Sequence, residues 1–149
     1  MSPQWIRMDG IVKHLVPRPY TMTGLLERAS DELGIRLFVL PKVRRGTPLT
    51  GVVVRDGDRG VILVPADAAE EFQVHIVAHE LWHLFCGHSC TQQTLKGYRA
   101  TTRSRFQEAC CERFARKVGL EIKRQRLERR EAMPQAARGL AEAFGIRSW

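Results

Sequence analysis

Residues 67–87 carry the clearest periodic pattern in the chain, because apolar side chains return every three or four positions. The apolar positions are Val74, Val77, Ala78, Leu81, Leu84 and Phe85. This spacing predicts an amphipathic helix with one buried face. Asp67 is suited to cap its start, and the acids Glu70 and Glu71 fall in the first turn, where the helix dipole favours them. Gly87 is expected to end the helix.

The segment before this helix predicts a small antiparallel sheet. Gly51–Arg55 and Val61–Val64 are rich in β-branched residues and flank a Gly/Asp cluster at residues 56–60. Two such runs around a Gly/Asp cluster are typical of a β-hairpin. A further β-rich run at residues 35–40 ends at Pro41.

Two more helices are expected on either side of these elements. Thr21 or Thr23 can cap the first, and Gly34 follows its last apolar residue. The second is expected over residues 102–118, with Gly119 as its stop. Residues 87–102, between the two downstream helices, are polar and are expected to form a loop.

The 149 residues fit one domain, since domains usually run to roughly 100–200 residues. We expect an irregular arm or a short helix over about residues 1–20 and a charged helical tail over about residues 120–149. Strands and helices are segregated along the chain and do not alternate, which favours an α+β fold with a small antiparallel sheet packed against helices.

The pattern His79-Glu80-Leu81-Trp82-His83 lies inside the predicted central helix. Residues four apart lie one turn apart on the same helix face, so His79 and His83 can bind one metal ion together. Glu80 flanks that ion and can take a proton from a water molecule on it. The alternative is a pair of partly buried, hydrogen-bonded histidines. We favour a zinc site because the pattern and its helical context agree.

A catalytic zinc ion needs a third protein ligand and one open position. The side chains that could supply the ligand are His75, Cys86, His88, Cys90, Glu108, Cys110, Cys111 and Glu112. Glu108 and Glu112 share a helix face, so one can ligate while the other accepts the N–H of a ligating histidine. We expect Glu108 to be the ligand. His75 is expected to lie outside the ligand set, because three turns of one straight helix span about 12 Å.

Three further predictions concern His88, Tyr98 and the cysteines. His88 is expected in a loop near the site as a substrate contact, and Tyr98 could donate a hydrogen bond in the transition state. Cys86 and Cys90, together with His88 and either Cys110 or Cys111, could form a structural zinc site, but buried free thiols are the preferred interpretation.

Charge and hydropathy restrict partners and location. The net charge of +8 favours acidic partners such as nucleic acid. The basic run Lys123–Arg130 could contact phosphates, although its interleaved acids favour a solvated helix face. The sequence has no apolar run of about 18 residues and no export signal, so we expect a cytoplasmic protein with reduced cysteines and no membrane span.

His79-Glu80-Leu81-Trp82-His83, followed by Glu108-x-x-x-Glu112-x-Phe114-Ala115, resembles the ImmA/IrrE family of zinc metallopeptidases. The resemblance covers about residues 25–119. It departs from the family pattern at Trp82, where Gly is usual, and at Cys111 and Glu112, which replace Ala and Asn or Asp.

The resemblance implies a thermolysin-like core in which His79, His83 and Glu108 bind zinc and Glu80 is the base. It also implies a regulatory protease that hydrolyses a protein partner, such as a helix-turn-helix repressor, in transcription regulation. The alternatives are a catalytically weak regulator that sequesters a protein, or one associated with nucleic acid through the basic tail. The native metal could also be iron or manganese, since two histidines and a carboxylate suit non-haem iron as well.

Overall fold

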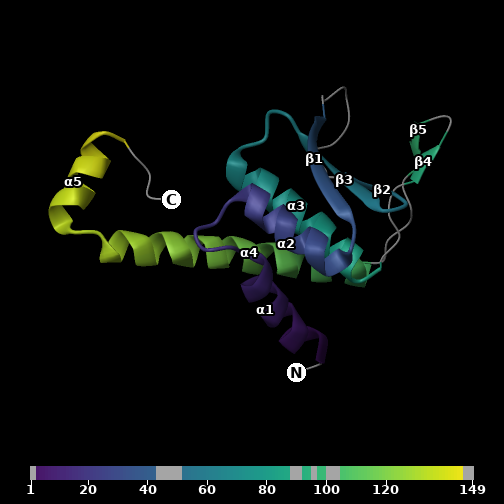
Figure 1. Cartoon of the computed structure of the whole chain (residues 1–149), viewed down its shortest axis with the longest axis horizontal. Coiled ribbons are helices and arrows are strands. Elements are labelled where there is room, and N and C mark those ends of the chain that lie inside the picture. Colours follow the sequence, from purple (N-terminus) through teal and green to yellow (C-terminus); the bar gives the residue numbers. More distant parts are fainter. Residues whose placement is uncertain (1–2, 43–51, 88–91, 95–96, 100–104, 146–149) are drawn as a thin grey trace.

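The computed structural model describes residues 3–42, 52–87, 92–94, 97–99 and 105–145 (Figure 1). In chain order its elements are α1 (Pro3–Leu15), α2 (Met22–Leu33), β1 (Arg36–Lys42), β2 (Val52–Asp56), β3 (Arg59–Pro65), α3 (Glu70–Phe85), β4 (Gln92–Thr94), β5 (Gly97–Arg99), α4 (Arg105–Ala132) and α5 (Gln135–Ala143). These helices and strands form an α+β fold, which confirms the predicted class.

The main sheet is mixed, with β3 in the centre and β1 and β2 at its edges. The predicted hairpin is confirmed: β2 and β3 are antiparallel, Asp56 pairs with Arg59, and Gly57 takes a positive φ of 57° in the turn. The prediction of an entirely antiparallel sheet was wrong, because β1 pairs parallel to β3. The strand pattern shows that a segment is extended, but the neighbour it pairs with depends on where the connection places it.

The ends of α2 follow from local chemistry. The Thr21 hydroxyl accepts a hydrogen bond from the backbone N–H of Gly24 at 3.0 Å, which caps the start of the helix. Gly34 ends it in the left-handed conformation, with φ 68°, and its N–H donates to the Ser30 carbonyl. Both the predicted cap and the predicted stop are therefore confirmed.

The segment before α2 is helical over α1, which is the second of the two possibilities expected for residues 1–20. Met8, Val12 and Leu15 recur at helical spacing and are buried, and α1 packs against α2 and α4. Lys117 on α4 forms an ion pair with Asp9 at 2.7 Å. Burial of this apolar face explains the helix, because short helices gain most of their stability from tertiary packing.

The helix α4 continues for 28 residues and passes through Gly119, where its end was predicted. A glycine inside a helix costs roughly 1 kcal/mol relative to alanine. The buried face continues beyond it with Ile122 and Gln125, and the Gln125 amide donates to the Pro17 carbonyl at 3.1 Å. Packing therefore outweighs the local preference. The second half of α4 extends away from the sheet and leads to α5 (Figure 1).

The predicted loop after Gly87 contains a short antiparallel hairpin, β4 with β5. Within the predicted helical tail, α5 begins directly after Pro134 and ends just before Gly145. Asp67 does not cap α3, because the N-cap residue is Ala69, which makes no side-chain cap hydrogen bond.

The core lies between the sheet and α4, with α3 in the middle. α3 contacts α4, β3 and α2, and these elements are layered in that way in Figure 1. Leu81 of α3, Ile62 of β3 and Phe114 of α4 are fully buried. α3 is thus fixed on several sides, which holds the side chains of its motif in place. Among the described residues, no helix is long and apolar enough to cross a membrane.

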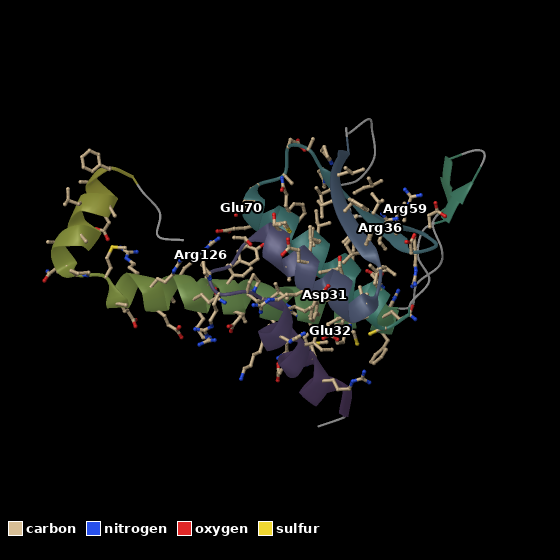
Figure 2. The ribbon with its side chains drawn as sticks, in the orientation of Figure 1. Asp31, Glu32, Arg36, Arg59, Glu70 and Arg126 are labelled. Carbon is tan, nitrogen blue, oxygen red and sulfur yellow. The ribbon has the colours of Figure 1, made fainter. Side chains whose placement is uncertain are left out.

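Tyr20 provides a test of this packing that does not depend on function. Burial, and then the nearby Glu70 carboxylate, raise the pKa of Tyr20 to about 12, while Arg126 acts in the opposite direction. Figure 2 labels both charges, Glu70 at the start of α3 and Arg126 on α4. A raised pKa means that folding favours the neutral phenol. The neutral Tyr20 hydroxyl therefore makes its full contribution to the free energy of unfolding below about pH 10. This contribution is lost as the pH rises towards 12.

We expect the phenolate absorbance of a Tyr98→Phe variant, which retains only Tyr20, to appear with a midpoint near pH 12. Circular dichroism recorded in parallel checks that the chain is still folded. A midpoint near pH 10 in folded protein would contradict the packing of Tyr20.

Candidate metal centre

The site begins with the two histidines of α3. His79 and His83 lie one turn apart, and their ring centroids are 5.1 Å apart. The His83 side chain is fully buried and that of His79 is 13% exposed. Since α3 is packed on several sides, the rings are held at the junction of α3 and α4.

The Glu108 carboxylate, from the first turn of α4, faces both rings. One oxygen lies 2.9 Å from Nε2 of His79, and the other lies 3.0 Å from Nε2 of His83. The structure therefore brings together the three side chains that were predicted as ligands. Their side chains come from two helices, and the Nε2 atom of each histidine lies within 3.0 Å of a Glu108 oxygen.

Glu112, one turn further along α4, contacts the other nitrogen of His79. Its Oε1 lies 2.8 Å from Nδ1 of His79, and its Oε2 lies 3.0 Å from Nε2 of His75. Partial burial raises the pKa of the Glu112 carboxyl, but hydrogen bonds and positive charge from His75 and His79 lower it by more, so it stays below its usual value. An ionised Glu112 orients the His79 ring so that Nε2 faces Glu108.

These contacts step in opposite directions along the two helices. His75 meets Glu112, His79 meets both acids, and His83 meets Glu108. α3 and α4 are therefore antiparallel at the site. His75 was expected outside the ligand set, and the structure places it against Glu112.

Glu80 and Trp82 lie on parts of α3 that are turned away from solvent. Glu80 is only 3% exposed, which is rare for an acid. Trp82 is also buried and stacks on Phe114, with ring centroids 4.6 Å apart. The residue that departs most in size from the family pattern is therefore a core residue.

Cys111 is a further donor at the site. Its sulfur and one ring nitrogen each of His79 and His83 lie within 4.8 Å of one another, a cluster that could hold a metal ion. Cys111 lies one turn after Glu108 on α4 and is fully buried. It was among the third-ligand candidates, but a buried thiol acting as a small apolar group was the preferred interpretation.

The remaining cysteines give no second cluster among the described residues. Cys86 is exposed and Cys110 is half-buried. Partial burial and the neighbouring Cys110 raise the pKa of the Cys86 thiol, while Arg7 lowers it. Cys90 and His88 lie outside the described residues. Tyr98 lies in β5, but its side chain is also outside them.

The basic run of α4 is largely engaged with acids of the same chain. Arg124 pairs with Glu121 at 2.7 Å and with Glu128 at 2.6 Å. Arg126 approaches Glu71, and Arg130 pairs with Glu142. This pairing is typical of a solvated helix face, as the interleaved acids predicted.

The donor set can be tested for its fit to zinc. Two ligands at 2.0–2.1 Å from a tetrahedral ion stand about 3.4 Å apart. The Glu108 oxygens lie 2.9 and 3.0 Å from the two Nε2 atoms, which is about 0.5 Å shorter than that ligand spacing. Two imidazoles and a carboxylate are also a ligand set that zinc enzymes use. Comparisons with protein-family models, curated proteins and solved structures find no match to this chain.

Proposed function

We propose that the protein is a zinc-dependent peptidase that cleaves a protein partner. The observation that carries this proposal is the Glu108 carboxylate, which faces Nε2 of both His79 and His83 at 2.9 and 3.0 Å. Without an ion, the Glu108 oxygens lie within 3.0 Å of the two ring nitrogens. With one, the three side chains are three of the four donors that a catalytic zinc site needs.

The roles follow from chemistry and position. His79, His83 and Glu108 would hold the ion, which when bound polarises a peptide carbonyl and makes water easier to deprotonate. Glu80 accepts the proton of the attacking water at its carboxylate and passes it to the leaving amine nitrogen. A nearly buried carboxylate suits this work, because little bulk water competes for its proton.

The substrate proposal rests on the family resemblance. We propose a cytoplasmic regulatory peptidase whose substrate is a helix-turn-helix repressor or a similar protein. The thermolysin-like arrangement of the core belongs to this proposal. It is supported by the helix pair α3 and α4, which carries the motif histidines on one helix and the carboxylate on the other.

Mapping of new protein N-termini tests this function directly. A cell lysate is incubated with zinc-loaded protein, and the exposed α-amino groups are then labelled and identified by mass spectrometry. We expect a small set of new N-termini that are absent after incubation with the Glu80→Gln variant. Identical sets in the two samples would contradict the peptidase function.

Glu112 allows a finer prediction about the metal site. Glu112→Gln removes the carboxylate that faces Nδ1 of His79, while the shape of the side chain is kept. We expect zinc affinity to fall by about 10- to 100-fold, the usual cost of losing a partner that orients a ligand. Competition with a chromophoric chelator measures the change.

Glu131→Gln, an exposed position near the end of the same helix, is the matched control and should bind zinc like the wild type. Equal affinity of Glu112→Gln and wild type would show that Glu112 does not orient His79.

A further inference from the structure

We propose that the thiolate of Cys111 is a fourth protein ligand of the metal, so that the resting site is closed. This inference rests on the proposed function, because it concerns the same His79 and His83 donors. It concerns regulation: a thiolate in the fourth position occupies the place that a reacting water needs.

The first argument is the position of the sulfur. Cys111 Sγ and one ring nitrogen from each of His79 and His83 all lie within 4.8 Å of one another. Zinc–sulfur bonds are about 2.3 Å and zinc–nitrogen bonds about 2.1 Å, so tetrahedral S and N ligands stand about 3.6 Å apart. Since the present separations are at most 4.8 Å, they exceed the spacing of ligands on one ion by no more than about 1.4 Å.

The second argument is the helix register. Cys111 follows Glu108 by three residues, so both lie on the face of α4 that meets α3. Glu108 is at the solvent side of the site, with its side chain 42% exposed, and Cys111 is at the buried side, with no exposure. An ion between the histidines would thus meet a carboxylate on one side and sulfur on the other.

The chemistry of the step is simple. When the divalent ion enters, the Cys111 thiol releases its proton to solvent and a sulfur lone pair forms the bond to the ion. Nothing is oxidised or reduced. Peptide cleavage then requires this bond to open, which would keep the resting protein at low activity.

Cobalt substitution tests the proposal without any substrate. Co²⁺ is added to the metal-free full chain and absorption is recorded. We expect visible d–d bands of a tetrahedral ion together with a near-ultraviolet sulfur-to-cobalt charge-transfer band. The charge-transfer band should be lost in Cys111→Ala and Cys111→Ser, whereas the neighbouring Cys110→Ala variant should retain it.

Two variants at Cys111 are used so that misfolding of one of them does not decide the test. The serine side chain has nearly the volume of cysteine, whereas alanine is smaller. Circular dichroism identifies a folded variant. We also expect Co²⁺ affinity to fall by about 10- to 100-fold in the Cys111 variants, at least the loss that follows removal of an orienting group.

The outcomes separate this inference from the proposed function. Visible bands without charge transfer in the wild type would overturn the Cys111 proposal and leave the His79–His83–Glu108 site standing. A charge-transfer band that persists in folded Cys111→Ser would overturn it in favour of another cysteine. No visible bands at all in the wild type would overturn both the metal site and the peptidase proposal.

Discussion

Glu80→Gln is expected to lower the rate of peptide cleavage by about 10²- to 10⁴-fold, the usual contribution of a positioned acid–base group. Glutamine has nearly the same shape as glutamate but cannot accept a proton at neutral pH. Zinc content should not change, because Glu80 is not among the proposed ligands His79, His83 and Glu108. The measurement is the rate of appearance of the new N-terminus in a substrate identified by N-terminal mapping, with zinc content measured on the same samples.

Glu71→Gln is the matched control, since Glu71 lies on the same helix but is 80% exposed and far along α3 from the site. Its rate should equal that of the wild type. Full activity of Glu80→Gln would rule out the proposed base. If Glu80→Gln failed to cleave but still regulated its partner in cells, the protein would act as a binding regulator.

His79→Ala is expected to abolish stoichiometric metal binding. His79 contacts Glu108 through one ring nitrogen and Glu112 through the other, so its loss removes a ligand and leaves two carboxylates without a shared partner. Elemental analysis of protein purified without chelator should find about one zinc ion per chain in the wild type and almost none in the variant.

Thermal unfolding gives an independent measure of the same event. A ligand that binds only the folded state at 100 times its Kd stabilises by about 2.7 kcal/mol. Added zinc should therefore raise the melting temperature of the wild type and of His14→Ala, whose histidine pairs with Glu32 away from the site. It should not raise that of His79→Ala. If the wild type held no metal even after zinc was added back, His79 and His83 would be structural histidines.

Much of the donor arrangement could be predicted from spacing. His79 and His83 are four residues apart in a helical pattern, and Glu108 and Glu112 are four apart in another, so each pair shares a face. Which carboxylate meets which ring nitrogen could not be predicted, because that depends on how far α3 is shifted along α4. The sequence favoured a buried apolar thiol over a ligand role for Cys111 for the same reason. The position of Cys111 relative to the histidines depends on the antiparallel packing of two distant segments.

The fold likewise has parts that could be predicted from the sequence and parts that could not. The cap at Thr21, the stop at Gly34 and the β2–β3 hairpin were predicted, because hydroxyl capping, positive φ and short turns involve only neighbouring residues. The parallel pairing of β1 and the passage of α4 through Gly119 were not. Both depend on burial against elements far away in the chain, which outweighs a local preference of roughly 1 kcal/mol.

The sequence by itself determined the identity of the chemical groups and the helix faces that carry them, since helical periodicity alone aligns residues three and four apart. Only the tertiary structure decided which groups meet. The packing of α3 against α4 places Glu108 opposite both histidines, Glu112 behind His79, and Cys111 at the buried side of the cluster. The physical reason is that a site built from two helices takes its geometry from their register, which the buried side chains of the whole core fix together.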